Sequence, residues 1–523
     1  MKLRFFCLFI LVFVLGGCAG GQVFYQTEPV VYESGNEINE TMFQFFNWNY
    51  PADQSLWNFG IQESAVLAEL GITSVWLPPA FKGGGTDDAG YGSYDLYDLG
   101  EFLQKGTVPT KYGTKDEYLG AIKEFRKNGI KVYADITLNH KGWAEGTETV
   151  KALSLDPQNR NKTVSGKSLD SPDPSDFKEI EAWCVFNFEG RNNKYSDFKW
   201  NSSHFDGVDW DQKTNSSGIF LFEGKSWDPV VSTMTGNPDY AMFADYDMEN
   251  SEVVNELMNW GKWYTEFTGI DGYRLDAVKH ISKDFYRDWI GEMRKEFGDM
   301  FIVAEYWAGT DEMLEWWEYT GSYCHLFDFE LQGRLGEMER RRGLADIRTL
   351  FDSKLYMKYP ENSVSFIENH DTQVRTPGVP SSHDFRIPAY AFILTRLQSV
   401  PCVFFGDYYG IPGILESLKD GLDVLLAVRR DRAYGTQRDY SFSEDIIGWT
   451  REGIKSCPDS GVAVLMNDNA RSSGAVCAMY VGDTHAGEIW KDVVGKGPSV
   501  VIDEFGYGNF AVSPRSCSVY IKE

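Results

Sequence analysis

The stretch Thr114–Thr137, TKDEYLGAIKEFRKNGIKVYADIT, contains the clearest indication of the fold. Thr114, followed by Glu117 three residues later, is the capping-box signature of a helix start. Apolar residues then recur at helical spacing until Gly129, which is typical of a helix end. The run Lys131–Thr137 that follows is apolar and short enough for a buried strand. The sequence therefore predicts an amphipathic helix that leads directly into a strand.

This unit recurs along the chain. A second helix is predicted between Ser282 and Gly298, with apolar residues on one face. Eight short apolar runs are candidate strands: Met42–Phe46, Ser74–Pro79, Lys131–Thr137, Gly272–Val278, Phe301–Trp307, Cys324–Phe329, Ser363–Asn369 and Val400–Asp407. Buried strands that alternate with helices predict an α/β protein built on a (β/α)₈ TIM barrel.

Two regions do not follow the alternation. Residues 140–245 are rich in Gly, Asn, Asp and aromatic residues, which indicates a β-rich domain inserted between the third strand and its helix. Residues 433–523 contain short alternating runs that predict a C-terminal antiparallel β-sandwich. More than one domain is expected, because one hydrophobic core rarely extends through a chain of 523 residues. The barrel is then expected over the remaining residues, 38–139 and 246–432.

The first 18 residues indicate export. A basic start with Lys2 and Arg4 precedes an apolar run, which is typical of a signal peptide and too short for a membrane span. The end of the run, Leu15-Gly-Gly-Cys18, is similar to a bacterial lipobox, in which Cys18 would be lipidated. The sequence leaves two locations open: extracellular, or anchored to the cell envelope as a lipoprotein.

The amino-acid composition limits the classes of molecule that the protein is expected to bind. A net charge of −27 disfavours nucleic acid and anionic membrane surfaces, which require a basic patch. Aromatic residues make up 15% of the chain and suit sugar binding, although most aromatic rings are simply core. The expected assembly is a monomer, and the only expected membrane contact is through Cys18.

The cysteines show no CxxC pair, which argues against a structural zinc site. Cys324 and Cys402 lie in strand-like runs and are expected to be buried thiols. A disulfide among Cys457, Cys477 and Cys517 is left open.

Four carboxylates lie at or just beyond the ends of predicted barrel strands: Asp135, Asp276, Glu305 and Asp371. In TIM barrels these ends form the active face. A buried carboxylate costs several kcal/mol unless it is paired or functional. Glycoside hydrolysis requires two such groups, ~5 to 5.5 Å apart when a covalent intermediate forms. The pattern therefore favours a glycosidase.

Four motifs carry a family resemblance: Asp135-Ile-Thr-Leu-Asn-His140, Gly272-Tyr-Arg-Leu-Asp-Ala-Val-Lys-His280, Glu305 with its strand, and Asn369-His-Asp371. With them the chain resembles the α-amylases of glycoside hydrolase family 13. Three further stretches are most similar to the bacterial liquefying enzymes: Val75–Lys82, Gly90–Asp98 and Tyr112–Lys115. The likeness extends from about Met42 to the C-terminus.

The resemblance implies an endo-acting, retaining hydrolase of internal α-1,4-glucosidic bonds in starch, amylose and maltodextrins. It implies that Asp276 is the nucleophile, Glu305 the general acid/base, and Asp371 the residue that holds sugar hydroxyls. Arg274 can keep the nucleophile ionised, and Glu305 needs a raised pKa to carry a proton. The expected substrate-binding residues are Tyr91, His140, Arg274, Lys279, His280 and His370.

The resemblance also implies metal ions. Asn139, Asp239, Asp245 and the carbonyl of His280 match a calcium site between the barrel and the insertion, with the oxygen ligands that Ca²⁺ prefers. A second cluster, with sodium beside a second calcium, is expected from Asp206, Asp228, Asp247 and Glu249.

Some metal positions depart from the family pattern. Glu249 stands where an aspartate is expected, and a third site near Glu444 and Asp445 is a weaker expectation. Val374 replaces the basic residue of the chloride-dependent amylases, so no chloride requirement is expected.

Two other readings stay open. A related transglycosylase, maltogenic amylase or α-glucosidase would share all four motifs and differ in loops. A non-catalytic starch-binding protein would lack an essential carboxylate, and none is missing here.

Overall fold

A computed structural model of the chain describes residues 23–523, except for residues 27, 35–37, 374–384 and 472. The predicted signal peptide with Cys18, and Val374 of the chloride prediction, lie outside the described residues. Within the described part of the chain, no helix has the length and apolar character needed to cross a membrane.

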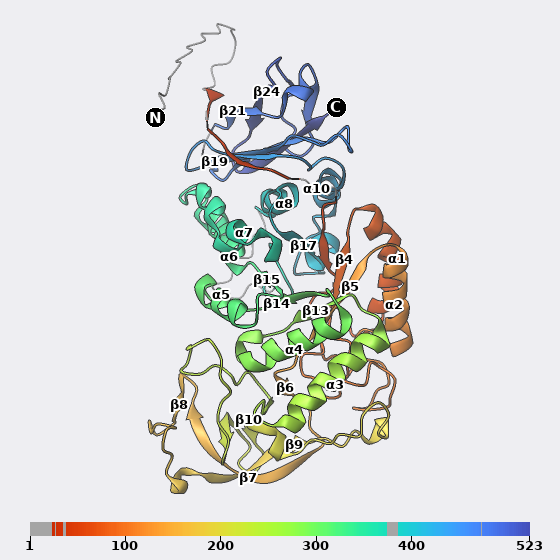
Figure 1. The fold of residues 1–523 in the computed structure, drawn as a ribbon, viewed down its shortest axis with the longest axis vertical. Helices are drawn as coiled ribbons and strands as arrows, with labels where there is room; N and C mark the ends of the chain where they lie inside the picture. The colour runs from red at the N-terminus through yellow and green to blue at the C-terminus, as the bar shows by residue number, and fades with distance from the viewer. Residues whose placement is uncertain (1–22, 27, 35–37, 374–384, 472) are drawn as a thin grey trace, which may run out of the picture.

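Eight parallel strands close into a barrel at the centre of the molecule (Figure 1). They are β3 (Met42–Gln44), β4 (Ser74–Leu77), β5 (Lys131–Ile136), β13 (Gly272–Leu275), β14 (Phe301–Ala304), β15 (His325–Phe327), β16 (Ser363–Phe366) and β17 (Val400–Phe404). β17 pairs with β3 and closes the ring. The predicted barrel and all eight strands are confirmed. Each strand ends one to three residues earlier than predicted.

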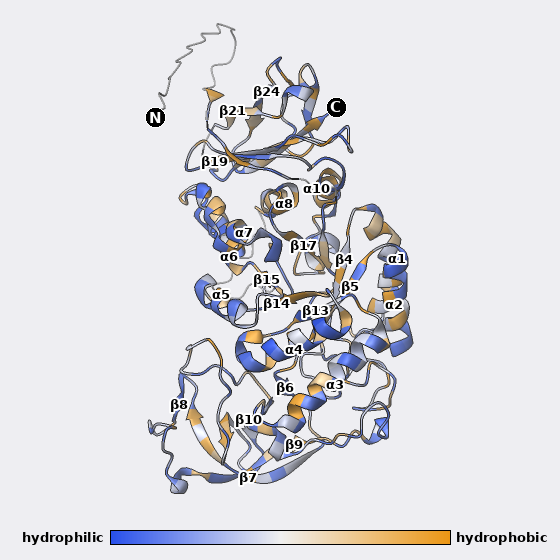
Figure 2. Cartoon of the chain, viewed as in Figure 1, coloured by the Kyte–Doolittle hydropathy of each residue, from blue (hydrophilic) through white to orange (hydrophobic). Residues whose placement is uncertain are grey.

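Helices surround the barrel. They are α1 (Leu56–Glu69), α2 (Lys115–Lys127), α3 (Ser251–Thr268), α4 (Lys283–Phe297), α5 (Thr310–Tyr319), α6 (Phe329–Arg341), α7 (Lys354–Lys358), α8 (Arg386–Thr395), α9 (Phe405–Tyr409) and α10 (Lys419–Asp431). Both halves of the predicted capping box at Thr114 are present. Ser282 caps α4, which ends at Gly298 with φ 79°. Figure 2 shows apolar and polar stripes along these helices, as expected for helices with one buried face.

A mainly antiparallel sheet is inserted between β5 and α3. Its strands are β6 (His140–Lys141), β7 (Gly146–Asp156), β8 (Asn159–Thr163), β9 (Lys178–Val185), β10 (Phe205–Asp211), β11 (Ser216–Phe222) and β12 (Ala244–Tyr246). Asp245 pairs with His140, so the last strand returns beside the first. We call this the inserted sheet, and it lies at one end of the long axis in Figure 1.

Two sheets occupy the opposite end. The strands from the C-terminal region are β18 (Gln437–Ser441), β19 (Ile446–Arg451), β20 (Val462–Asn467), β21 (Ala475–Tyr480), β22 (Ile489–Asp492), β23 (Val500–Val501), β24 (Tyr507–Val512) and β25 (Ser516–Lys522). The sequence analysis missed two N-terminal strands that join them. β1 (Val23–Phe24) pairs with β21, and β2 (Val30–Tyr32) pairs with β18. The residue boundaries of the domains stay predictions.

All six cysteines in the described part of the chain are free thiols. Cys324 and Cys402 are buried, as predicted. Cys457, Cys477 and Cys517, for which a disulfide was left open, form none in the structure.

Candidate active site and metal centre

Arg274 joins the carboxylates at the C-terminal end of the barrel. Strand register places it beside Asp135 on β5. Its Nη1 donates to Asp135 Oδ1 at 2.8 Å and to Asp276 Oδ1 at 2.5 Å, and its Nη2 lies 2.9 Å from Glu305 Oε2. The guanidinium is buried, so these charges interact with little screening by water. Asp276 and Glu305 therefore both contact the guanidinium of Arg274.

Asp276 and Glu305 differ in their surroundings. Thr137 Oγ1 also donates to Asp276, at 3.2 Å, which fixes the direction of that carboxylate. Burial raises the pKa of Glu305 to about 8, opposed by Arg274 and reinforced by the nearby Asp276. The backbone N–H of Ala277 donates to Glu305 Oε2 at 2.9 Å. Glu305 therefore retains a proton near neutral pH.

The loop after β16 carries Asp371 and His370. Asn369 Oδ1 accepts the backbone N–H of Asp371 at 2.9 Å, which holds the turn. Burial raises the pKa of Asp371 and holds the pKa of His370 well below its usual value. His370 Nδ1 lies 2.9 Å from Gln44 Nε2, and its Nε2 lies 3.3 Å from Asp371. A neutral His370 next to Asp371 is available to hydrogen-bond a substrate.

Stacked rings form one side of the site. Tyr91 is almost parallel to His370, with ring centroids 5.2 Å apart, and its hydroxyl donates to Asp135 at 2.7 Å. Trp48 stacks on Tyr91 with centroids 5.8 Å apart and is 44% exposed. Trp48 was not among the predicted site residues, although it lies just beyond the first barrel strand, where functional residues gather.

The other predicted binding residues lie around this centre. His140 Nε2 is 2.8 Å from the carbonyl of Tyr91. Lys279 donates to the carbonyl of Trp307 at 2.9 Å. The His280 ring contacts the carbonyl of Pro238 at 2.5 Å, and burial lowers its pKa to about 4. The His280 side chain therefore faces the inserted segment.

The oxygens predicted for the first calcium converge on the Asn139 amide. Its Nδ2 lies 2.6 Å from the His280 carbonyl, 3.1 Å from Asp245 Oδ1 and 3.2 Å from the Asp239 carbonyl. Asp245 Oδ2 is buried without a hydrogen-bond partner. Three oxygens at one point and an unpartnered carboxylate oxygen fit a hard cation such as Ca²⁺. The donor set is therefore suited to the predicted metal.

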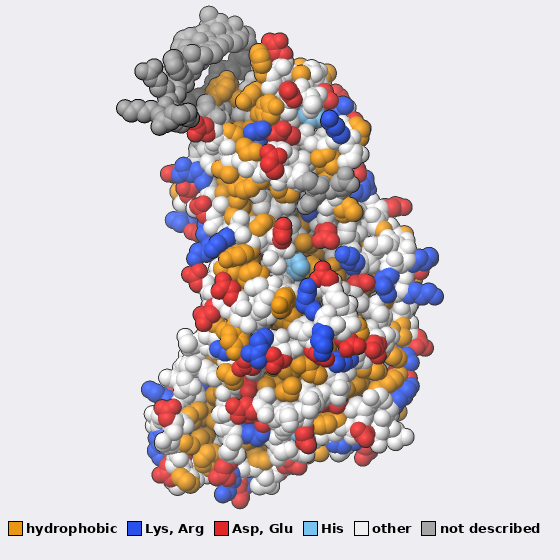
Figure 3. All heavy atoms as spheres, viewed as in Figure 1, with side chains coloured by type: hydrophobic (Ala, Val, Ile, Leu, Met, Phe, Trp, Pro, Cys, Tyr) orange, Lys and Arg blue, Asp and Glu red, His pale blue; other side chains and the backbone are white. Residues whose placement is uncertain are grey.

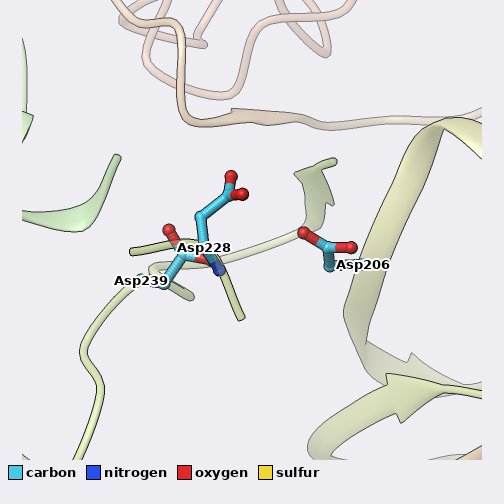
Figure 4. Close-up of side chains that lie close together, drawn as sticks. All are labelled: Asp206, Asp228 and Asp239. Carbon is cyan, nitrogen blue, oxygen red and sulfur yellow. The ribbon is translucent and has the colours of Figure 1, made fainter. Parts of the chain in front are cut away.

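A second acidic group adjoins the first. Ligand atoms of Asp206, Asp228 and Asp239 lie within 4.8 Å of one another, and Figure 4 shows the three side chains gathered from separate segments. Oδ2 of Asp206 and Oδ1 of Asp228 are buried without hydrogen-bond partners. Burial raises the pKa values of Asp206 and Asp228 to about 10 and about 9. Such a group is stable with charge only beside a cation.

The rest of the predicted second cluster is arranged differently. Asp247 forms an ion pair with Lys225 and accepts the backbone N–H of Glu249 at 2.9 Å. The negative charge of Asp247 is therefore already neutralised by Lys225. Asp239, assigned from the sequence to the first site alone, reaches both groups.

The two residues expected at the third metal site have different partners. Glu444 lies 3.7 Å from Arg348, whereas Asp445 contacts Asn469. Burial, with Asp445 nearby, raises the pKa of Asp468 to about 7. The sequence analysis missed Asp468.

Charged side chains elsewhere are interspersed. On the face drawn in Figure 3, acidic and basic groups alternate without a continuous basic patch.

Comparisons with known proteins identify the family of the chain. Residues 60–472 match the family described as "Alpha amylase, catalytic domain". An α-amylase of Geobacillus stearothermophilus is 46% identical, covering 98% of this chain and 92% of the relative. A glucan 1,4-alpha-maltohexaosidase of Bacillus sp. (strain 707) is 44% identical, covering 93% of each. The solved α-amylase of Geobacillus thermoleovorans, complexed with acarbose, has a TM-score of 0.59 at 19% identity and covers 93% of this chain and 98% of that one. That structural likeness supports the fold.

Proposed function

The chain belongs to the α-amylase family of glycoside hydrolases, and from that premise we propose that it hydrolyses internal α-1,4-glucosidic bonds of starch with retention of configuration. One observation carries the proposal. Arg274 contacts both Asp276 and Glu305, while burial keeps a proton on Glu305 near neutral pH. A fixed carboxylate beside a protonated carboxyl is the pair that retaining glycosidases require.

In the first step, Asp276 attacks the anomeric carbon and a glycosyl ester forms. The bond between that carbon and the glycosidic oxygen breaks, and the leaving oxygen takes the proton of Glu305. In the second step, Glu305 removes a proton from water, whose oxygen attacks the same carbon and releases Asp276. The proton balance is restored, because Glu305 ends the cycle protonated.

The neighbouring residues hold the substrate. Asp371 is proposed to accept hydrogen bonds from sugar hydroxyls, and His370 is proposed to donate one to them. The Tyr91 ring, nearly parallel to the adjacent His370 and Trp48 rings, is proposed to present an aromatic surface to the apolar face of a pyranose. Lys279 and His280 are proposed to line the leaving-group side. Arg274 positions both catalytic carboxyl groups.

Calcium is proposed to join the barrel to the inserted sheet. Asn139, Asp239, Asp245 and the His280 carbonyl would hold the first ion, and Asp206 and Asp228 would hold a second with Asp239. The unpartnered carboxylate oxygens support both sites. The bound ion supplies positive charge that neutralises this acidic interior. For Asp247, together with Glu249, to hold a further ion such as sodium, the Lys225 ammonium that pairs with Asp247 would have to be displaced.

The size of the product is a separate question. The maltohexaosidase relative is nearly as similar as the α-amylase relative, so identity alone does not favour endo action over release of one short product. Chromatography of the first products from long amylose distinguishes endo action from release of one short product. Mixed oligosaccharides support endo action, whereas one short product or glucose favours the alternative.

Substitution tests the mechanism. Glu305→Gln should lower starch hydrolysis by about two to four orders of magnitude, the range for loss of a general acid. Glu315→Gln, on the exposed side of α5, is the matched control and should keep wild-type activity. With α-maltosyl fluoride, whose leaving group needs no acid, Glu305→Gln should accumulate a glycosyl ester on Asp276. Near-normal starch hydrolysis by Glu305→Gln would contradict the proposed roles.

We also propose export, either to the medium or as a lipoprotein anchored at Cys18. The signal-peptide pattern and lipobox support this. Incorporation of labelled fatty acid into the wild type, lost in Cys18→Ala, would favour the anchored form. Unlabelled protein in the medium would favour the free form.

A further inference from the structure

Three buried arginines lie together where the barrel joins the C-terminal sheets. Arg396 directly follows α8, Arg429 lies in α10, and Arg451 is the last residue of β19. Their exposed fractions are 0%, 4% and 0%. We call this group the arginine cluster, and none of its members has a role in the mechanism above. A buried guanidinium costs several kcal/mol unless its charge is compensated, so each member needs a partner.

Arg396 has such a partner. Its Nη1 and Nη2 donate to the two carboxylate oxygens of Asp439, each at 2.7 Å. The rings of Phe351 and Phe392 lie 4.6 and 4.8 Å from the guanidinium carbon and exclude water from this pair. A two-point contact of this kind is the strongest form of ion pair that arginine makes. The single negative charge of Asp439 is therefore already matched by Arg396.

Arg429 is held by neutral oxygens instead. Its Nε donates to Thr41 Oγ1 at 2.8 Å, its Nη1 to the Leu394 carbonyl at 2.8 Å, and its Nη2 to the Glu40 carbonyl at 2.6 Å. The Glu40 side chain is 52% exposed and pairs with Lys131 at 3.6 Å. Burial lowers the pKa of Arg429 to about 10. The hydrogen bonds of Arg429 are therefore satisfied, but its positive charge is not neutralised.

Arg451 lacks both kinds of compensation. Its Nε donates to the Gly435 carbonyl at 2.9 Å, but Nη1 and Nη2 are buried without a hydrogen-bond partner. Burial, with Arg429 and Arg396 nearby, lowers the pKa of Arg451 to about 9. Arginine nevertheless stays protonated at neutral pH. Among the residues that the structure describes, no carboxylate lies within ion-pair distance of Arg451 or Arg429. The arginine cluster therefore lacks a negatively charged acceptor.

Strand register shows which way Arg451 faces. Arg451 on β19 lies opposite Gln437 on β18, which lies opposite Tyr32 on β2. Residues directly opposite one another share a face of the sheet, as do residues two apart on one strand. Trp449, two residues before Arg451, donates to Thr395 Oγ1 in α8 at 2.8 Å. Arg451 is therefore on the face that packs against the barrel.

A cavity of about 590 Å³ lies beside this row of residues. Its lining includes Tyr32, Gln398 and Arg429. Gln398 Oε1 accepts the Gln437 side-chain amide at 3.0 Å, so the cavity reaches the immediate neighbours of Arg451. Ile38, which also lines it, is 71% exposed, so the cavity is open to solvent. A small hydrated ion can therefore approach the arginine cluster.

A small inorganic anion fits these requirements better than water or a protein partner. Water would accept the hydrogen bonds of Arg451 but would leave the unpaired charges close together in an interior of low polarity. A partner's carboxylate cannot reach terminal nitrogens that are fully buried. A monatomic anion accepts hydrogen bonds from several directions and needs little space. It would neutralise one charge and reduce the repulsion among the three arginines.

We propose that Arg451 binds a small inorganic anion of the size of chloride, and that this anion stabilises the junction between the barrel and the C-terminal sheets. The inference goes beyond the proposed function and does not depend on it. Residues 396–399 precede β17, at the N-terminal ends of the barrel strands, whereas Asp276 and Glu305 follow C-terminal ends. The anion should therefore stabilise the fold without accelerating hydrolysis, in contrast to the anion of the chloride-dependent amylases.

Thermal unfolding of the calcium-loaded enzyme tests the proposal. Sodium chloride replaces sodium gluconate at constant ionic strength and neutral pH, so that only the identity of the anion changes. The unfolding temperature should rise by about 2 to 4 °C and then level off as one site fills, while the rate of starch hydrolysis stays the same. An unfolding temperature that does not respond to chloride, or that rises without saturation, would overturn the proposal.

A substitution identifies the residue that binds the anion. Arg451→Met removes the charge and retains an unbranched side chain, and replacing an uncompensated buried charge by an apolar group is often neutral or stabilising. In gluconate the variant should unfold at or above the temperature of the wild type, and chloride should no longer shift it. Arg287→Met, which removes an exposed arginine of α4, is the matched control and should keep the chloride response. A chloride response retained in Arg451→Met would overturn the proposal.

Crystallography with bromide requires no variant. Bromide replaces chloride in such sites and is located by its anomalous scattering. Crystals of the wild-type enzyme soaked in bromide should show an anomalous peak within hydrogen-bond distance of both terminal nitrogens of Arg451. An ordered water at that position, without an anomalous peak, would overturn the proposal whatever the unfolding temperatures show.

Discussion

Removal of calcium should make the stability of the enzyme depend strongly on pH. Asp206, Asp228 and Asp239 are almost fully buried, and burial raises their pKa values from 3.8 to about 10, 9 and 7. In the unfolded chain, the same groups ionise near their usual value. Between about pH 5 and pH 7, the metal-free folded protein therefore holds protons that the unfolded chain has released.

The direction of the pH dependence follows from the difference between the folded and unfolded pKa values. Because the folded pKa values lie above the unfolded ones, the protonated groups favour folding in acid, and this stability is lost as pH rises from about 4 towards 10. Each proton held only by the folded state contributes a slope of about 1.4 kcal/mol per pH unit. With one to three protons held, the free energy of unfolding should fall by about 1 to 4 kcal/mol per pH unit. Calcium bound at the proposed sites would replace these protons and remove the slope.

Calorimetry of the calcium-loaded and the chelated enzyme across this pH range measures the effect. The gap between their unfolding temperatures should widen from about pH 5 to about pH 7. Asp228→Asn should reduce the slope of the chelated enzyme, whereas Asp288→Asn, at an exposed carboxylate, should not. A difference in unfolding temperature that stays constant or narrows with rising pH would contradict this prediction.

Four other expectations follow from single residues. The kcat/KM for starch should fall as pH rises through about 8, because deprotonated Glu305 cannot protonate the leaving oxygen; a pH–rate profile without an alkaline limb there would contradict this. Trp48→Ala should raise KM by roughly two- to tenfold through loss of the stack on Tyr91, and an unchanged KM would exclude Trp48 from substrate binding. Thr114→Ala should lower the free energy of unfolding by about 1 kcal/mol in denaturant titrations without changing kcat, and no change would mean that its cap is dispensable. Replacing acetate with chloride should not accelerate hydrolysis, as Val374 predicts; activation would show a chloride site formed by other residues.

The barrel was predictable because its strands are continuous apolar runs. Both faces of such strands are buried, as the wholly buried β4 and β16 show. The helix at Thr114 was predictable because its capping chemistry is local. The carboxylates proposed as catalytic are conspicuous in the sequence because they are polar residues at the ends of such runs.

Other features depend on pairing between distant segments. The contacts of Arg274 with three carboxylates follow from strand register, which a single strand does not encode. β1 and β2 are two and three residues long, too short for a periodic pattern, and their partners lie more than 400 residues away. The ion pair of Lys225 with Asp247 depends on the path of a loop.

The pairing of β1 and β2 with the C-terminal sheets also fixes how an anchored enzyme would be oriented. Cys18 precedes Val23 by five residues, a reach of at most ~18 Å in extended chain. A lipid on Cys18 would therefore hold the C-terminal sheets next to the membrane. The inserted sheet lies at the far end of the long axis in Figure 1, so a lipid at Cys18 would hold this sheet away from the membrane surface.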